Sequence, residues 1–370
     1  MKFLEIYIRN FLAFIESEEY KHFKKIPITR ERAVSQYQNP NADAQDVGLI
    51  IALNDNNEMM GYIGILPDKI HLKNHIEKFY WNTCWWVDPL VGKKAAMPLF
   101  YRMLKITGMR QIFFELTPKT AAVIDKLPYF SVVLRSGTRL FFRSYLGEIF
   151  SQKNKVKSIA PVFKVVDALW NIMWCPLRSF VENNGEHTFK GQYEVISDID
   201  EEVDGFIQQN SQKQVIRRGR AELNWIMHYP WLIAENENKS LEFQKRKYYF
   251  SHRVKSFRHY LVKLYLPEKK MIAFLVMNER NDHFSIPYLF CEPEKIKIAV
   301  NFIRYFLMKK KAKSFYTFNK QVLNVVEKWR LPHIFKLKLT KYMGFPANDK
   351  YKELKHAYYQ DGDGDVVFTG

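Results

Sequence analysis

The sequence contains few cysteines, glycines and prolines, and each scarcity excludes a class of protein. Its cysteines, Cys84, Cys175 and Cys291, stand far apart and form no CxxC pair. They therefore exclude a disulfide framework and a cysteine-rich zinc site. Gly and Pro number only 15 each, whereas hydrophobic residues make up 47% of the 370 residues. Disordered, collagen-like and low-complexity chains are thus excluded, and the length indicates about two globular domains.

Long uninterrupted apolar runs are also missing. Lys2, Glu5 and Arg9 bring charge into the amino-terminal segment, which therefore does not resemble a signal peptide. The most apolar stretch, residues 160–181, contains charged residues such as Asp167 and is too short between charges to span a bilayer. We expect a cytoplasmic protein without a transmembrane segment.

Positive charge, in contrast, is abundant. The chain has 57 Lys and Arg against 39 Asp and Glu, a net charge of +18. Such an excess favours anionic partners: nucleic acid, anionic lipid or a small molecule with a polyphosphate. Basic stretches with aromatic neighbours, at 217–220, 245–249 and 309–313, suit tRNA if they share one surface. A lysine-rich solvated surface is the alternative explanation.

Hydrophobic periodicity predicts a mixed α/β order in the first part of the chain. Met59 to Leu66 follows a run of Asn and Asp residues, which indicates a hairpin over 47–66. The other predicted elements are helices at 11–23, 30–38, 93–105 and 121–127, and strands at 79–87 and 111–116.

The same order returns after residue 191, which suggests an internal duplication. Asp88-Pro89 corresponds to Glu292-Pro293 at an offset of 204, and residues 123–126 correspond to 325–328 at an offset of 202. We therefore expect domains at 1–145 and 189–370, joined by a connector at 146–188 with an amphipathic helix. Chance resemblance of two mixed folds stays open.

The chemically informative segment is the predicted strand-to-helix loop at 87–96. Unpaired backbone amides at a helix start, reinforced by the helix dipole, favour phosphate groups. Gly92 and two alanines permit close approach, and Lys93 and Lys94 add positive charge.

This loop resembles the strand-to-helix loop of the GNAT superfamily of acyl-CoA-dependent N-acyltransferases. Val87-Asp88-Pro89, Gly92-Lys93 and Ala96 match its pattern if one residue is deleted after Pro89. Val91 stands in place of the family's arginine, Lys94 in place of its central glycine and Ile124 in place of a common tyrosine. The resemblance implies two tandem GNAT-like α/β domains, each a mixed, mostly antiparallel sheet flanked by helices.

The resemblance also implies a function and a site. The donor would be acetyl-CoA or another acyl-CoA, the acceptor an amine of a cell-envelope sugar or peptide intermediate, and no metal would take part. Glu115 is the candidate base and Tyr129 the candidate proton donor. The candidate acyl-CoA residues are Trp86, Val87, Val91, Gly92, Lys93, Lys94, Ala95 and Ala96, with Trp86 and Val87 supplying backbone amides to the thioester carbonyl.

Several alternatives stay open. Tandem units also resemble Fem-type aminoacyltransferases, which use aminoacyl-tRNA, and GNAT-like proteins of polysaccharide biosynthesis, to which the terminal 361–365 motif is similar. The second loop carries Glu292 and Glu294, which favour an acceptor-binding or structural role for that copy. The missing arginine and tyrosine fit an inactive binding protein. The helix within 160–181 packs between domains or contacts an anionic membrane.

Overall fold

A computed structural model describes residues 1–73, 75–151, 158–189, 191–234, 247–250, 252–329 and 332–369. The basic residues at 152–157 and 245–246 lie outside these ranges. The chain forms two compact units. Unit 1 comprises Met1–Arg135, Asp198–Phe257 and Lys341–Thr369, and unit 2 comprises Ser136–Ser197 and Arg258–Thr340.

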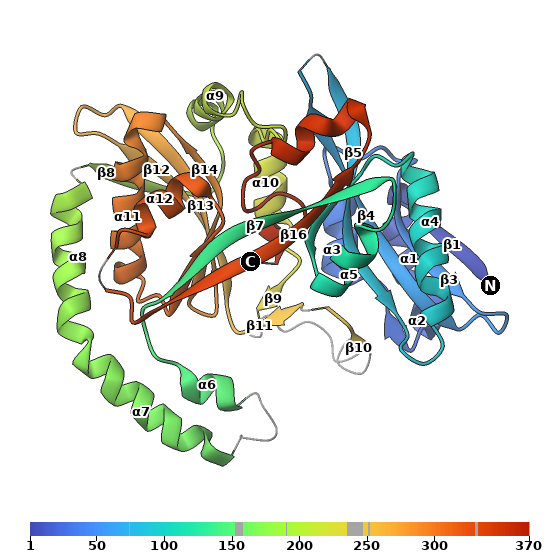
Figure 1. Ribbon diagram of the computed structural model, residues 1–370, viewed down its shortest axis with the longest axis horizontal. Helices are drawn as coiled ribbons and strands as arrows, with labels where there is room; N and C mark the ends of the chain where they lie inside the picture. Colours follow the sequence, from blue (N-terminus) through green and yellow to red (C-terminus); the bar gives the residue numbers. More distant parts are fainter. Residues whose placement is uncertain are drawn as a thin grey trace. The chain divides into compact units, whose positions relative to one another are not determined.

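The sheet of unit 1 is mixed and mostly antiparallel (Figure 1). Its strands, in spatial order, are β1 (Lys2–Tyr7), β3 (Val47–Leu53), β4 (Met59–His71), β5 (Ile76–Val87), β6 (Gln111–Leu116) and the unit 1 part of β16 (Phe335–Pro346). Neighbouring strands run antiparallel except β5 and β6, which run parallel. The short strands β2 (Lys25–Ile26) and β10 (Lys247–Tyr248), and β9 (Ile233–Ala234) and β11 (Arg253–Val254), form parallel pairs.

Helices cover both faces of this sheet. Along β3, Leu49 and Ile51 pack in one core and Ile50 in the other, as the alternation of strand side chains requires. The first core includes α1 (Phe11–Glu16), α2 (Glu18–His22) and α3 (Arg30–Tyr37), and the second includes α4 (Ala96–Thr107) and α5 (Pro118–Ile124). The unit also contains α9 (Glu201–Asn210), α10 (Arg220–His228) and the 3-10 helices η1 (Ile8–Asn10), η2 (Lys93–Ala95), η6 (Asp349–His356) and η7 (Val366–Phe368).

The sheet of unit 2 has a corresponding order of strands. They are β8 (Gln192–Ile196), β12 (Phe257–Tyr265), β13 (Met271–Arg280), β14 (His283–Cys291), β15 (Ser314–Thr317) and the unit 2 part of β7 (Phe130–Phe141). Here β14 and β15 are the parallel pair, and β7 runs antiparallel to β15. The strand beside each parallel pair is therefore supplied by the other half of the sequence: β16 lies beside β6, and β7 beside β15.

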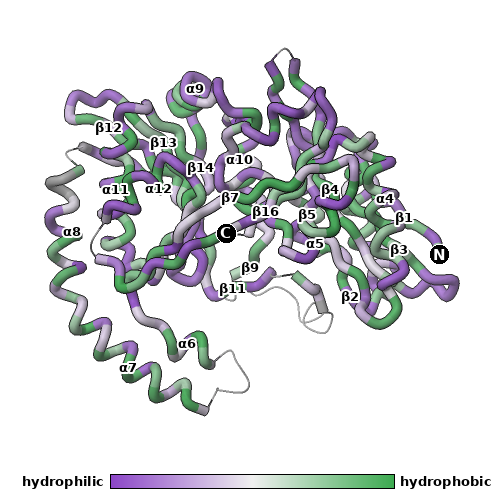
Figure 2. The backbone as a smooth tube through the Cα atoms, viewed as in Figure 1, coloured by the Kyte–Doolittle hydropathy of each residue, from purple (hydrophilic) through white to green (hydrophobic). Residues whose placement is uncertain are grey.

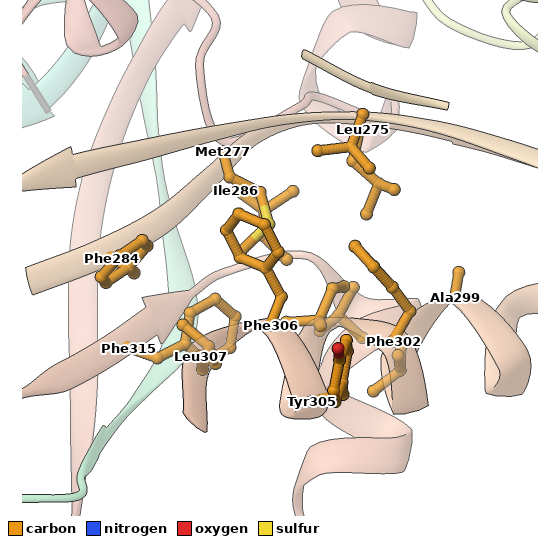
Figure 3. Packing of buried hydrophobic residues seen from close by; sticks show 14 of the residues in the cluster. Leu275, Met277, Phe284, Ile286, Ala299, Phe302, Tyr305, Phe306, Leu307 and Phe315 are labelled. Carbon is orange, nitrogen blue, oxygen red and sulfur yellow. The ribbon is translucent and has the colours of Figure 1, made fainter. Parts of the chain in front are cut away.

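Helix α11 (Ile296–Lys309) forms the centre of the unit 2 core. Figure 3 shows its side chains Phe302 and Phe306 directed toward Leu275 and Met277 of β13 and Ile286 of β14. The aromatic and aliphatic side chains of this cluster are almost fully buried, so they supply most of the hydrophobic stabilisation of the unit. α12 (Lys320–Val326) and the 3-10 helix η5 (Pro293–Lys295) flank α11.

The described residues between 146 and 189 form α6 (Leu146–Ser151), α7 (Ala160–Met173) and α8 (Cys175–Phe189), all within unit 2. Hydrophobic and hydrophilic residues alternate along α7 (Figure 2). The exposed apolar side chains of α7 include Val162, Val165, Leu169, Ile172 and Met173, which are between 61% and 69% exposed. Within the described ranges, no helix combines the length and the apolar character needed to cross a membrane.

The structure confirms the predicted α/β class, with mostly antiparallel sheets flanked by helices. The helix expected at 11–23 is interrupted at Ser17, whose extended backbone ends α1 and whose hydroxyl caps α2. The helix expected at 121–127 lies instead at Pro118–Ile124, as α5, because Thr117 caps its start and Pro118 occupies its first turn. The sequence analysis placed domain boundaries at 145 and 189, whereas the compact units divide the chain at other positions. The expected domain boundaries stay a proposal.

Candidate active site

Parallel pairing between β5 and β6 covers only a short distance. It joins Tyr80 to Gln111, Trp81 to Ile112 and Asn82 to Phe113, and it stops there within the described residues. The pairing of β4 with β5 is also irregular nearby, with a register shift between Ile63 and Ile65. Beyond Asn82 the two parallel strands therefore diverge, which leaves space between neighbouring strands of one sheet.

A cavity of about 460 Å³ occupies this space in unit 1. Strand β5 contributes Asn82, Thr83, Trp85 and Val87, β6 and its end contribute Phe114, Glu115 and Leu116, α4 contributes Ala96 and Met97, and the α5 region contributes Thr117, Lys119, Thr120 and Val123, with Phe250 also lining it. The lining is mainly apolar, with a carboxylate, an ammonium group and hydroxyls. Such a cavity can hold an extended ligand and fix its orientation.

The predicted phosphate-binding loop lies at one end of this cavity. β5 ends at Val87, and the chain enters η2 at Lys93 and α4 at Ala96, so the expected strand-to-helix transition is present. Gly92 is required sterically. A Cβ there would lie 2.2 Å from the carbonyl oxygen of Met60 and 2.4 Å from the backbone nitrogen of Asp88.

Part of the loop is already occupied by the protein itself. The carboxylate of Asp88 accepts hydrogen bonds from the amides of Leu90 at 2.9 Å and Val91 at 3.3 Å, and it pairs with Lys25 at 2.7 Å. The Lys25 ammonium and the Leu90 amide lower the pKa of Asp88, which stays charged. Asp88 thus fills the position that an anion would take beside Leu90 and Val91.

Another part of the loop is available to a ligand. The backbone amides of Lys93 and Lys94 begin the helical turn and have no acceptor within the described chain, and both side chains are exposed. Ala95 is buried and its amide donates to Gly92 at 2.8 Å. Of the predicted acyl-CoA residues, only Val87 and Ala96 line the cavity. Trp86 is buried in the opposite core.

Glu115 lies in the cavity with an unusual backbone. Its φ is 55°, in the left-handed region that non-glycine residues rarely occupy. Its carboxylate is 3.7 Å from the ammonium of Lys341, which is only 5% exposed. Burial lowers the pKa of Lys341, and the attraction of Glu115 opposes this shift. Lys341 was not predicted as a site residue, because it lies far from Glu115 in the sequence.

Tyr129, the other predicted catalytic residue, is not brought to the cavity. Its side chain is half exposed, and its carbonyl oxygen accepts a hydrogen bond from Ala347 at 2.8 Å. Ile124, at the position of the family's tyrosine, is fully buried in the core with α4. Among the described residues, the cavity lining contains no tyrosine. Glu115 and Lys119 are the titratable groups of the lining within the described ranges.

The corresponding loop of unit 2 differs in charge. After β14, Glu292 pairs with Lys270 at 2.7 Å, and Glu294 lies in the first turn of η5. Carboxylates at this helix start repel a diphosphate. Within the described chain, no group of three His, Cys, Asp or Glu side chains is arranged to hold a metal ion.

No family model and no curated protein matches the sequence. Solved structures with a similar chain path are N-acyltransferases by description. A probable N-acyltransferase from Enterococcus faecalis has a TM-score of 0.48 at 10% identity, over 93% of this chain and 71% of that one. A GCN5-related N-acetyltransferase from Kribbella flavida has a TM-score of 0.49 at 8% identity, over 93% and 70%.

Saccharomyces cerevisiae N-myristoyltransferase with bound myristoyl-CoA has a TM-score of 0.47 at 9% identity, over 93% of this chain and 82% of that one. All these TM-scores are below 0.5, so these likenesses assign no function to this chain.

Proposed function

We propose that unit 1 is a GNAT-type N-acyltransferase with an acyl-CoA donor. The observation that carries this proposal is the end of parallel pairing at Asn82 and Phe113, with a cavity between the diverging strands. The arm of the acyl-CoA that carries the thioester would lie in this cavity. Its diphosphate would lie at the helix start formed by Lys93 and Lys94, whose amides and side chains supply positive charge.

The proposed chemistry is transfer of the acyl group to an amine. The neutral amine attacks the thioester carbon, the C–N bond forms, the C–S bond breaks, and the amine loses a proton. Glu115 lines the cavity and accepts that proton directly or through water. Because the described residues of the lining include no tyrosine, we propose that a water molecule, and not Tyr129, passes the proton from Glu115 to the thiolate.

The acceptor in this proposal is an amine of a cell-envelope sugar or peptide intermediate. It rests on the resemblance to polysaccharide-associated GNAT proteins. The matching strand order of the two units supports the tandem arrangement on which that resemblance depends. Unit 2 would serve as an acceptor-binding or structural domain, since Glu292 and Glu294 oppose a second acyl-CoA site.

The aminoacyl-tRNA alternative has less support. Arg218, counted in a basic stretch, is buried and paired with Asp68 within unit 1. In unit 2, Lys309 donates to Tyr193 and Tyr305, and Lys313 pairs with Glu148. These cations are engaged by the protein. Retention of bulk tRNA that falls steeply with salt would revive this alternative.

Titration with acetyl-CoA by calorimetry tests the donor. We expect the parent protein to bind, and the double variant Lys93→Ala/Lys94→Ala to bind at least about tenfold more weakly, because it loses two charged partners of the diphosphate. Lys105→Ala, at the other end of α4, is the matched control and should bind like the parent. Absence of binding by the parent favours the inactive alternative, which the occupation of two loop amides by Asp88 also supports.

We also propose that α7 contacts an anionic membrane surface. Its apolar side chains are exposed and Trp170 accompanies them, while the net charge of +18 favours anionic lipid. Flotation with phosphatidylglycerol vesicles should recover the protein, and phosphatidylcholine vesicles should not. Leu169→Glu should abolish recovery, whereas Leu134→Glu, at an exposed position of β7, should not. Equal recovery of the Leu169→Glu variant would remove α7 from the proposal.

A further inference from the structure

Unit 2 contains a small cavity of about 240 Å³ on the face of its sheet opposite α11. Leu140, Phe284 and Phe315 pack with α11 in the core, and strand alternation directs their neighbours to the other face. The described residues that line the cavity all belong to unit 2: Arg139, Tyr145, Asn278, Arg280, Asn281, His283, Ser285 and Tyr316.

Strand pairing brings four of these residues into one row. Arg139 of β7 pairs with Tyr316 of β15. Tyr316 pairs in turn with Ser285 of β14, and Ser285 with Asn278 of β13. Paired residues on neighbouring strands direct their side chains to the same face of the sheet. Asn278 and Ser285 are only 1% and 5% exposed, so a buried polar row with an arginine at one end lines the cavity.

A second row adds another arginine. Arg280 of β13 pairs with His283 of β14, two residues along each strand from Asn278 and Ser285. Residues two apart on a strand share a face, so Arg139 and Arg280 line the cavity from the same face of the sheet. A guanidinium carries its charge at every physiological pH. The lining therefore holds two fixed positive charges.

Within the described chain, the charge of Arg139 is not compensated. Its guanidinium carbon lies 5.0 Å from the ring centroid of Tyr316. Its buried Nε has no hydrogen-bond partner, and no carboxylate of the described residues pairs with the guanidinium. The carboxylates of Glu148 and Asp282 pair with Lys313 instead, at 2.7 and 3.2 Å. The described lining contains no acidic residue, so an anion in the cavity would meet uncompensated positive charge.

The titration of His283 is consistent with this positive charge. Burial and the nearby cations Lys313 and Arg139 lower the pKa of His283 to about 4, against the attraction of Glu148 and Asp282. His283 is thus neutral at neutral pH and leaves the charge of the cavity to the arginines. An anion beside it would offset the cations and raise the pKa of His283.

Size and charge select the ligand. A phosphate monoester carries a charge near −2 at neutral pH, which matches two guanidinium groups, whereas a carboxylate would neutralise only one. Each guanidinium presents a planar fork that forms two parallel hydrogen bonds with phosphate oxygens. A cavity of about 240 Å³ holds a phosphoryl group and a few further atoms, and it is smaller than cavities that enclose a drug-sized ligand.

We propose that Arg139 and Arg280 bind the phosphoryl group of a small molecule in this cavity, either inorganic phosphate or a phosphate monoester. This inference concerns unit 2 and does not depend on the N-acyltransferase function proposed for unit 1. It gives unit 2 a ligand of its own, whereas the carboxylates of Glu292 and Glu294 oppose an acyl-CoA there.

Calorimetric titration of the full chain at pH 7.5 with inorganic phosphate, glucose 6-phosphate and glucose tests the site. We expect one or both phosphorylated probes to bind and glucose not to bind. Tighter binding of glucose 6-phosphate supports a phosphate monoester as the ligand, and equal or tighter binding of inorganic phosphate supports free phosphate. Binding of neither probe would overturn the proposal.

Substitution of the arginines tests the location. Arg139→Gln and Arg280→Gln should each weaken binding at least about tenfold, because each removes a charge-assisted partner of the phosphoryl group. Arg139→Lys keeps the charge without the planar fork and should bind with intermediate affinity. Lys297→Gln removes an exposed cation from α11 and should bind like the parent. If both glutamine variants also bind like the parent, the site is refuted.

Histidine NMR of the parent protein tests the location without relying on a folded arginine variant. Saturation with the probe that binds should raise the pKa of His283, whose signals are assigned with His283→Asn. The signals of the exposed His22 in unit 1 should not move. An unchanged titration of His283 would place the anion elsewhere and overturn the proposal. Because acetyl-CoA binding is measured at Lys93 and Lys94 of unit 1, either proposal stands or fails without the other.

Discussion

The carboxylate of Asp68 accepts two hydrogen bonds from the guanidinium of Arg218, at 2.9 and 2.6 Å, and both side chains are 4% exposed. Asn41 and the indole of Trp81 donate to the same carboxylate at 2.9 and 2.6 Å. The residues of this network come from β4, β5, the segment between α3 and β3 and the segment before α10, so it joins distant parts of the sequence within unit 1.

Asp68→Ala should destabilise unit 1 by about 3–5 kcal/mol, because it leaves the Arg218 charge buried without a counterion. Chemical denaturation followed by tryptophan fluorescence measures the change. Glu18→Ala, which breaks the exposed pair with Lys21, is the control and should cost less than about 0.5 kcal/mol. Similar losses for the two variants would show that the buried network is not a major source of stability.

Gly92→Ala should destabilise unit 1 by about 1–3 kcal/mol, since its methyl group would overlap the backbone of Met60 and Asp88. It should also weaken acetyl-CoA binding by displacing the turn before Lys93. Gly205→Ala in α9 meets nothing within 4 Å and should be neutral or stabilising. Unfolding curves and acetyl-CoA titrations of both variants check these expectations. A Gly92→Ala protein as stable as the parent would contradict the close approach of the Met60 and Asp88 backbone to Gly92.

Glu115→Gly should be more stable than Glu115→Ala by about 1 kcal/mol, because a φ of 55° suits glycine and strains alanine. Both substitutions remove the interaction with Lys341, so their difference isolates the backbone. Urea denaturation of the two proteins gives this difference directly. Acyl transfer should be lost in both, and an alanine variant at least as stable as the glycine variant would argue against the left-handed conformation.

Unit 2 should lose stability as the pH falls from about 6.5 toward 4. Burial lowers the pKa of His259 to about 4, against a hydrogen bond with Asn278, and burial with nearby Lys313 and Arg139 lowers that of His283 to about 4. Between pH 6.5 and 4 these histidines bind protons in the unfolded state but stay neutral in the folded state. Their contribution to the free energy of unfolding is therefore complete above pH 6.5 and disappears toward pH 4.

The loss should be on the order of a few kcal/mol, measured by denaturation between pH 7.5 and 4.5. The double variant His259→Asn/His283→Asn should show a flatter dependence, whereas the exposed His22→Asn should leave it unchanged. A parent protein with no pH dependence in this window would show that these histidines titrate normally.

Local elements were predictable from the sequence because their signals are local. The hairpin expected at 47–66 begins with β3 at Val47–Leu53, and the strand at 111–116 has the predicted bounds, since apolar runs and turn residues mark their ends. Strand β16 was not predicted, although Lys336 and Lys338 alternate with Phe335 and Leu337 as in a strand. Its place beside β6 depends on the pairing of Tyr342 with Leu116, which no local pattern reveals.

The candidate site was predictable only in part for the same reason. The segment order located the loop at residues 87–96, and Gly92 proved necessary there. The carboxylate of Asp88, however, fills part of the loop, and that depends on side-chain geometry. Lys341 lies far from the loop in sequence. Its approach to Glu115 and its burial depend on the fold, and the alternating pattern around it does not show that this lysine is buried.

Because β16 comes from the end of the sequence and pairs with β6 near its beginning, the sheet of unit 1 cannot be completed until late in synthesis. Residues 1–135 emerge early, yet Lys341–Thr369 is the last described segment of the same unit to be made. Until then β6 lacks its neighbour β16, and its free backbone groups form an open edge. The nascent chain must therefore keep this edge from pairing with other chains while the intervening residues are synthesised.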